Sequence, residues 1–275
     1  MKFIKQLVSV STVALTGAFM IAPMAAASDV TETRDVSGFD KVEQRGSSDV
    51  IVTFGSNFKV EVKADEDDIN EILTEVRGDT LVVSEEDCRR NCNRSGATIY
   101  ITMPSLEAFS SSGSGDTDIT DLAASKFDYD QRGSGDLRIS GSCEDGDFDM
   151  RGSGGVFSSS FKCSDVEIST RGSGDVELSG FEVQDLELTT RGSSDIDLDG
   201  TCGSMVVSKQ NSGDLKARDF ICETIDLESS GSGDSRIHAT KSVSVSIRGS
   251  GDVDVYGGAK IEKLRSTGSG DVEVH

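Results

Sequence analysis

The chain has 275 residues, among them 30 glycines and no tryptophan, and a formal net charge of −22. Such acidity argues against nucleic acid as a partner, because contacts to phosphate need a basic surface, and it favours binding to cations or basic surfaces. Acidic chains rich in glycine and serine can be disordered. Here, however, the apolar residues recur at fixed intervals, which indicates a folded repeat.

The first 27 residues have the layout of a secretory signal peptide. Lys2 and Lys5 give a positive start, an apolar stretch covers 7–21, and three alanines at 25–27 form a small-residue cleavage site. The apolar stretch is shorter than the roughly 20 residues that a membrane anchor needs. We therefore expect export to the periplasm, the cell surface or the medium. The mature chain, 28–275, would carry a charge of −24, since both lysines are lost, and no integral membrane segment.

Residues 55–110 form an irregular N-terminal insertion or cap, in which the repeat described below is broken. Within it, Ile69, Ile72, Leu73 and Val76 follow the helical spacing i, i+3, i+4, i+7, with acids before them and an arginine and a glycine after them. This pattern predicts one short amphipathic helix. We expect the helix to cover the end of a stack of repeats, as solenoids need, and a ligand-binding subdomain is the alternative.

A corner motif of the form Gly-Ser-Gly-Asp recurs along the rest of the chain. It starts at Gly46, Gly113, Gly133, Gly152, Gly172, Gly192, Asn211, Gly231, Gly249 and Gly268. From Gly113 onward the motifs are 18 to 20 residues apart, and a fixed period of this size is the signature of a solenoid. The glycines predict tight corners with positive φ. A phosphate-binding loop is excluded, because nothing helical follows the motif and no lysine or threonine stands where such a loop needs one.

Polar and apolar residues alternate after each corner, as in Asp175-Val176-Glu177-Leu178, and an apolar residue recurs four positions before the next corner. A period of two predicts strands with one buried face, here two short strands per coil. Such coils can bury that face only by stacking. The sequence thus predicts an all-β fold, a parallel β-helix of 19–20-residue coils that is regular over 113–275. Right-handed crossovers are the general preference, so we expect a right-handed helix.

Four cysteines each lie nine residues before the next corner, namely Cys143, Cys163, Cys202 and Cys222. The same column holds Val183, Thr240 and two alanines. Neighbours in register lie about 4.8 Å apart, within the range of a disulfide. We therefore predict the bridges Cys143–Cys163 and Cys202–Cys222, with buried free thiols as the alternative. Cys88 and Cys92 are predicted to clamp a loop tip, and a zinc site is the rival interpretation.

The aspartates of the corners are expected to form a ladder along one edge of the solenoid: Asp116, Asp136, Asp175, Asp195, Asp214, Asp234, Asp252 and Asp271. Like charges at that spacing repel by roughly 1 kcal/mol in water. Each carboxylate can be satisfied by capping corner N–H groups, and arginines that precede the corners can interleave with them. The alternative is a row of calcium ions bound by these oxygens. No other cofactor is expected.

Several stretches resemble the head GIN domain family, whose members are labelled as auto-transporter adhesins. They are Arg34-Asp35-Val36-Ser37-Gly38-Phe39-Asp40-Lys41-Val42, the first corner at 46–50, Ile101-Thr102-Met103-Pro104-Ser105-Leu106 and the later corners. The resemblance implies a β-helical fold, export to the bacterial envelope and an adhesive role. It brings no catalytic residues.

An enzyme is not expected from the remaining residues. The chain has two histidines; His238 falls in a predicted column with Phe161, Phe181 and Phe220, and neither His238 nor His275 has a recognisable nucleophile partner. Coils of uniform length leave no long loop to wall a cleft. We predict a non-catalytic adhesion module whose polar face binds a glycan or protein of the envelope or the exterior. The alternatives are a purely structural envelope protein and, less favoured, a carbohydrate-active β-helix enzyme.

Overall fold

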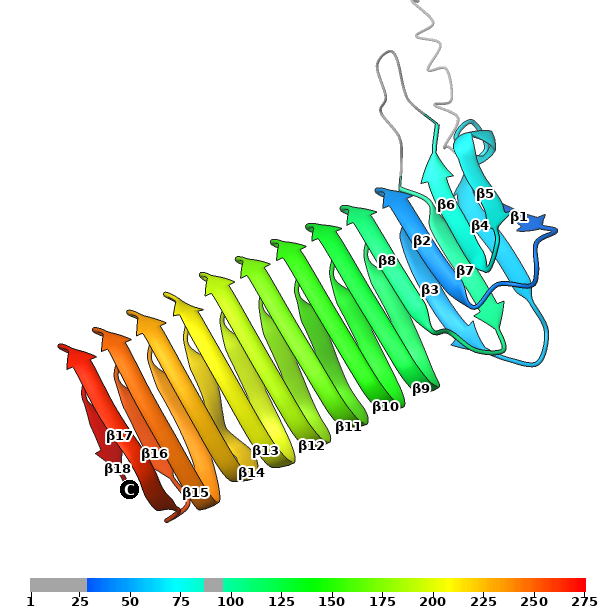
Figure 1. Cartoon of the computed structure of the whole chain (residues 1–275). Helices are drawn as coiled ribbons and strands as arrows, with labels where there is room; N and C mark the ends of the chain where they lie inside the picture. The colour runs from blue at the N-terminus through cyan, green and yellow to red at the C-terminus, as the bar shows by residue number, and fades with distance from the viewer. Residues whose placement is uncertain (1–28, 87–95) are drawn as a thin grey trace, which may run out of the picture.

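The computed structural model describes residues 29–86 and 96–275. They form a β-solenoid of about eight turns, elongated and capped by a broader N-terminal portion (Figure 1). The expected signal peptide at 1–27 and the Cys88–Cys92 pair lie outside the described residues. In the described part of the chain, no helix is long and apolar enough to cross a membrane.

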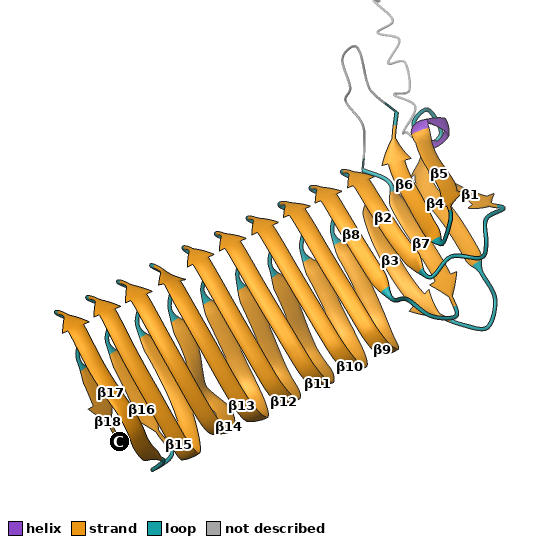
Figure 2. Ribbon diagram, in the orientation of Figure 1, coloured by secondary structure: helices purple, strands orange, loops and turns teal. Residues whose placement is uncertain are grey.

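Each regular coil is one long, bent strand rather than the two short strands that the alternation predicted. These strands are β9 (Thr117–Gly133), β10 (Leu137–Gly152), β11 (Val156–Gly172), β12 (Val176–Gly192), β13 (Ile196–Asn211), β14 (Leu215–Gly231) and β15 (Ser235–Gly249). Neighbouring coils pair in parallel along almost their whole length, and only the corners are loops (Figure 2). The predicted parallel β-helix is therefore confirmed.

Two bends give each coil three sides. In β12 the inward residues are interrupted by two exposed pairs, Ser179-Gly180 and Gln184-Asp185. We call the three outer surfaces, in chain order after a corner, the first, second and third face. On the inside, stacked apolar columns fill the core; for example, the ring centroids of Phe161 and Phe181 lie 6.3 Å apart. Each such buried side chain contributes about 1.5–3 kcal/mol.

The corners need glycine for two independent reasons. Gly172 has a φ of 143°, which disfavours other residues, and a Cβ added to it would lie 1.9 Å from the carbonyl oxygen of Gly152 on the coil before. A Cβ on Gly174 would likewise lie 1.9 Å from the oxygen of Gly154. The corner glycines thus allow the coils to stack at the spacing of a β-sheet.

Buried polar side chains brace the corners from inside. Gln44 Nε2 donates to Ser48 O at 2.7 Å. Lys209 is 2% exposed, and its Nζ donates to Gly233 O at 2.6 Å and Asp234 O at 2.9 Å. Burial lowers the pKa of Lys209 to about 8, because a desolvated ammonium is disfavoured.

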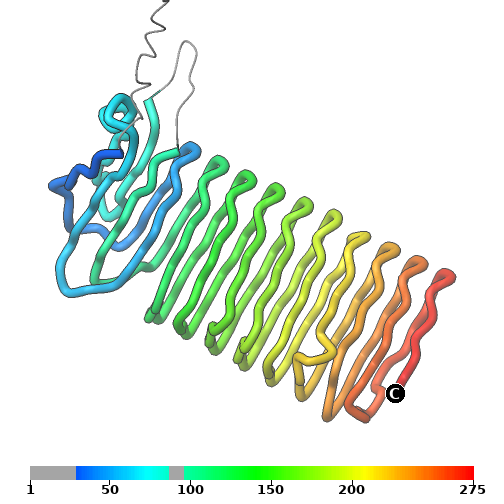
Figure 3. The backbone as a smooth tube through the Cα atoms, turned by 180° about the vertical axis from the view of Figure 1, so that it is seen from behind, coloured from blue at the N-terminus to red at the C-terminus, as the bar shows by residue number. Residues whose placement is uncertain are grey.

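The N-terminal portion contains β1 (Asp29–Arg34), β2 (Lys41–Gly46), β3 (Asp49–Phe54), β4 (Lys59–Asp65), β5 (Ile72–Arg77), β6 (Thr80–Glu85), β7 (Thr98–Met103) and β8 (Ala108–Gly113). Strands β2 and β3 form a coil that pairs with β8 and β9 on one side and with β6 and β7 on the other. Strands β4 and β5 then pair antiparallel with β7 and β6 and close this end of the stack, which Figure 3 shows from behind.

The predicted amphipathic helix is wrong. Only Ile69–Glu71 form a 3-10 turn, and β5 follows at once, antiparallel to β6. Ile72, Thr74 and Val76 alternate inward, and these β-branched residues favour a strand. The i, i+3, i+4, i+7 spacing in the sequence arises because Ile69 of the turn directly precedes this alternating strand. The cap is therefore made of antiparallel strands instead of a helix.

The C-terminal end consists of β16 (Val253–Tyr256), β17 (Lys260–Gly268) and β18 (Val272–Val274). All nine residues of β17 are exposed. They include Ile261 and Leu264, although their pairing partners in β15, Val243 and Val245, are buried.

Candidate functional site

The structure brings the eight predicted corner aspartates into one row. The backbone N–H of Asp136 donates to Asp116 Oδ1 at 2.9 Å, and that of Asp195 to Asp175 Oδ1 at 2.9 Å. The same bond links Asp214 to Asp195, Asp234 to Asp214, Asp252 to Asp234 and Asp271 to Asp252. The row is interrupted only where Gly155 replaces an aspartate; its N–H donates to Asp136 Oδ1 but it offers no carboxylate to Asp175. Capping therefore engages one oxygen of each of these carboxylates, from Asp116 to Asp252.

The arginines before the corners pair along the third face and do not interleave with the corner aspartates. Arg132 lies 3.0 Å from Asp130, and Arg171 lies 3.3 Å from Asp149. On the first face, by contrast, Arg138 lies 3.3 Å from Asp116 and 3.8 Å from Asp136. The expected interleaving is wrong, because strand alternation points the preceding arginines to the third face.

Two disulfides staple neighbouring coils, and both are those predicted. The Cα atoms of Cys143 and Cys163 lie 4.6 Å apart, and those of Cys202 and Cys222 lie 4.4 Å apart. At Gly146, which lacks the inward side chain of its column, a Cβ would make tight contacts with the Phe148 ring at 3.1 Å and with Cys143 Sγ at 3.2 Å.

A set of carboxylates in register lies on the third face, and we call it the acid row. It comprises Asp145 and Asp147 of β10, Asp165 and Glu167 of β11, and Asp185 and Glu187 of β12, which are in register. They line an open groove of about 340 Å³, in which the one cation among the described lining residues is Lys126. Lys126 Nζ is itself engaged by Asp128 at 2.8 Å.

The carboxylates of the acid row repel one another. Partial desolvation raises the pKa of Asp147, and the neighbouring Asp128 and Asp149 raise it further. The pKa of Glu167 is raised by desolvation and by Asp147, Glu187 and Asp149. Like-charged carboxylates in register disfavour one another's ionised form. A cationic group seated in the groove would relieve this repulsion.

Sequence reasoning expected a polar face of serine, threonine and acids but did not single out the acid row. The available signal was position, since its members stand five and seven residues before the corners at Gly152, Gly172 and Gly192. Counting outward columns in the same way as the inward ones would have found it.

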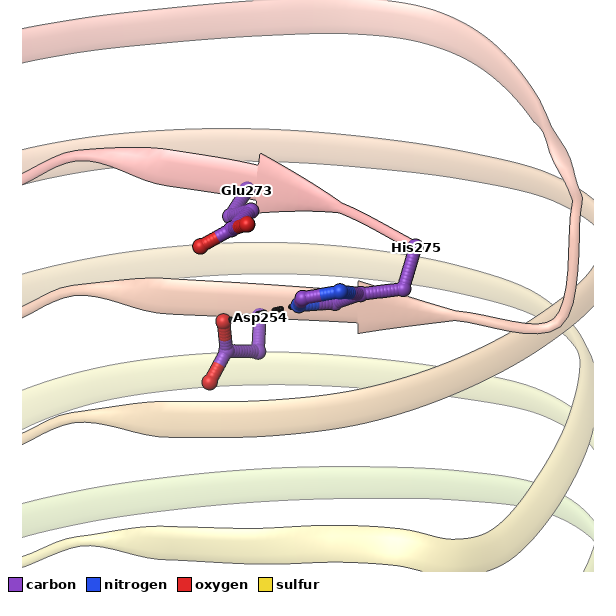
Figure 4. Close-up of side chains that lie close together, drawn as sticks. All are labelled: Asp254, Glu273 and His275. Carbon is purple, nitrogen blue, oxygen red and sulfur yellow. Dashed lines mark hydrogen bonds and ion pairs between the residues drawn. The ribbon is translucent and has the colours of Figure 1, made fainter.

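A second cluster, at the C-terminal end, joins Asp254 of β16 with Glu273 of β18 and His275 (Figure 4). One ligand atom from each lies within 4.8 Å of the others, and His275 Nε2 lies 3.1 Å from Asp254 Oδ1. The His275 ring stacks on Tyr256, with centroids 4.5 Å apart. An imidazole and two carboxylates can bind a divalent metal, although Arg236 Nε also lies 3.6 Å from Asp254. Sequence reasoning missed Asp254 as a partner of His275, because the two residues are 21 positions apart and lie on neighbouring coils.

Comparison with known proteins decides the family. The sequence profile of the family described as "Putative auto-transporter adhesin, head GIN domain" matches residues 38–179 and 148–259. The chain belongs to the head GIN domain family. A comparison with curated proteins found no match.

Solved structures share the fold of this head GIN protein. A putative lipid binding protein from Parabacteroides distasonis is 21% identical, with a TM-score of 0.68, over 90% of this chain and 96% of that chain. A putative adhesin from the same species is 16% identical, with a TM-score of 0.71, over 90% and 98%. A putative adhesin from Parabacteroides merdae is 15% identical, with a TM-score of 0.69, over 90% and 96%. At these identities the likeness concerns the solenoid architecture.

Proposed function

We propose that this head GIN protein is an exported, non-catalytic binding module of the bacterial cell envelope. It holds a partner from the envelope or the exterior, a protein or a glycan, against the outer faces of its stacked coils. The family description as an adhesin supports this role. The N-terminal sequence, with the features of a signal peptide, supports export.

The observation that carries the proposal is the acid row on the third face. Six carboxylates from three consecutive coils line one open groove, and burial and repulsion raise the pKa values of Asp147 and Glu167. A protein that keeps mutually repelling carboxylates along an open groove is suited to a partner that supplies the missing positive charge. A basic protein surface fits the length of the row better than one small cation, because it contacts several coils at once.

Binding to an array of glycans and matrix proteins, with and without calcium, tests the proposal. The wild type is compared with an acid-row variant that carries Asp147→Asn, Asp165→Asn, Glu167→Gln and Glu187→Gln. A matched control removes the same number of charges elsewhere, by Asp197→Asn, Asp199→Asn, Asp219→Asn and Glu223→Gln.

We expect the wild type and the matched control to retain basic protein ligands and the acid-row variant to lose them. We also expect this binding to weaken as salt is raised, because exposed charge pairs are screened. Equal losses in both variants would show that only net charge matters. An array without any binding by the wild type would remove the proposed function itself.

A further inference from the structure

One coil departs from the others on the first face, and the departures lie together. In β11, Phe157 occupies an outward column that is charged in the coils on either side, where Arg138 and Glu177 are its pairing partners. The next inward position is Ser158, although Ile139 and Leu178 stand there in the adjacent coils. The pairing of β11 with β10 shifts register at this place, but other neighbouring coils shift register at the same bend. The side chains of β11, and not its pairing, therefore distinguish this coil.

The break in the aspartate row belongs to the same feature. A Cβ on Gly155 would lie 2.9 Å from the Phe157 ring, so the ring rests where an aspartate would otherwise stand. Asp121 of β9 has a φ of 61°, the only positive φ of a non-glycine residue in the described chain. Its N–H donates to Ser140 Oγ of β10 at 3.2 Å.

Phe157, Ser158 and Ser140 line a groove of about 390 Å³ on the first face, within the size range of small-ligand sites. One column across the groove consists of Asp118, Arg138, Phe157 and Glu177. The hydroxyl side chains of Thr120, Ser140, Ser159 and Ser179 also line the groove. Arg138 pairs with Asp116 at 3.3 Å and with Asp136 at 3.8 Å, which directs its guanidinium along the groove edge next to the corners.

We infer that this groove binds a neutral oligosaccharide. The face of a sugar ring carries C–H bonds that pack on an aromatic ring such as Phe157, while its hydroxyls both donate and accept hydrogen bonds. The carboxylates of Asp118 and Glu177 accept such bonds, and Arg138 donates them. The serine and threonine hydroxyls of the groove can both donate and accept them. An anionic sugar is opposed by the chain's net charge of −22. A lone cation is opposed by Arg138 in the middle of the groove.

The inference rests on the proposed binding role and gives it a ligand class and a second, separate face. The acid row lies on the third face and shares none of its residues with this groove. Variants in the two places therefore report independently.

The test is binding of the full exported chain to an array of neutral, amino and acidic oligosaccharides, followed by titration with the highest-scoring neutral one. We expect Phe157→Ala to weaken this binding about tenfold or more, as loss of an aromatic anchor does, and Phe157→Trp to retain it. Arg138→Gln should also weaken it. Ile221→Ala, which removes an apolar side chain 43% exposed on another face, and the acid-row variant should leave it unchanged.

A thermal melt is recorded for each variant. If Phe157→Ala proves to be unfolded, the comparison of glycan binding by Phe157→Trp and by Arg138→Gln decides whether the groove is the binding site. The inference is overturned if no neutral oligosaccharide binds, if only acidic sugars or peptides bind, or if Phe157→Ala binds like the wild type. Loss of basic protein ligands by the acid-row variant, with glycan binding absent, would leave the proposed function standing and remove only this inference.

Discussion

Asp195 Oδ1 accepts the backbone N–H of Asp214 from the next coil at 2.8 Å. The bond is a capping contact between coils, and it explains why a row of like charges is tolerated at the corner. An acceptor oxygen is all that the bond needs, and a negative charge is not required.

The first prediction follows from this relationship. Asp195→Ala should destabilise the fold by about 1–2 kcal/mol, because a corner N–H loses its acceptor. Asp195→Asn keeps an acceptor oxygen and removes repulsion from Asp175 and Asp214, so it should be neutral or stabilising. Denaturant melts with and without calcium measure both variants. A calcium-dependent stability that Asp195→Asn abolishes would instead favour a calcium ladder.

The second prediction concerns the corner glycines. Gly172→Val should destabilise by more than about 3 kcal/mol, because the new side chain meets both an unfavourable φ and the Gly152 carbonyl. The control, Asp197→Val, places the same side chain at an exposed strand position and should change stability by less than about 0.5 kcal/mol. Similar melts for the two variants would contradict the account of the corner.

The third prediction concerns the disulfides. Each bridge spans 20 residues in sequence, so loss of one bridge should cost about 3 kcal/mol by the loop-closure argument. Cys143→Ala with Cys163→Ala is compared with Cys202→Ala with Cys222→Ala in urea melts, and peptide mapping without reductant identifies the pairs. Free thiols at these positions in the oxidised protein would refute the pairing.

The fourth prediction is a pH dependence that arises from Lys209. Its pKa in the folded protein, about 8, lies below the ordinary value of 10.5, so the unfolded chain binds the proton more tightly. The buried charge therefore opposes folding below pH 8, and this opposition fades as the pH rises from 8 to 10.5. The Tm of the wild type, relative to Lys209→Met, should rise across that range.

Lys126→Met is the control for this pH dependence. A hydrogen bond to Asp128 raises the pKa of Lys126 above its ordinary value of 10.5, so the folded protein keeps this proton across the same range and Lys126 gives no rise in stability there. A wild-type Tm that runs parallel to that of Lys209→Met would show that Lys209 does not titrate there.

Features that repeat with the period of the chain could be predicted from the sequence. The corner glycines, the inward columns and the two disulfides all depend on stacking in register, and a constant distance from the corner reveals it. The corners from Gly46 onward therefore predict the fold, the aspartate row and both bridges.

Features that depend on where a coil bends could not be predicted in this way. The coil between Gly231 and Gly249 is short, and its pairing with the coil before it shifts register at both bends. Ala239 rather than Thr240 therefore pairs with Cys222. His238 likewise leaves the predicted phenylalanine column; it pairs with Ile221, and its Nδ1 lies 3.1 Å from Arg218 O. Counting back from a corner assumes equal bends, and here that assumption fails.

Singular residues were missed for a related reason. Phe157 and Gly155 look like scatter within a repeat, because a search for periodicity averages over departures from it. Only the structure shows that the Phe157 ring occupies the space beside Gly155, and that the acid row and the Phe157 groove lie on different faces.

The central claim is that the protein binds along its stacked coils, and neutralising the acid row coil by coil tests it most directly. The three variants are Asp145→Asn with Asp147→Asn, Asp165→Asn with Glu167→Gln, and Asp185→Asn with Glu187→Gln, alone and combined. The dissociation constant for the highest-scoring basic protein of the array is measured for each, alongside a melt.

We expect each pair to weaken binding by a similar factor, roughly three- to tenfold, because each removes charge pairs of comparable strength. The factors should multiply in the combined variants. Complete loss of binding from one pair, with an unchanged melt and no effect of the other two, would instead show a discrete site and contradict the account.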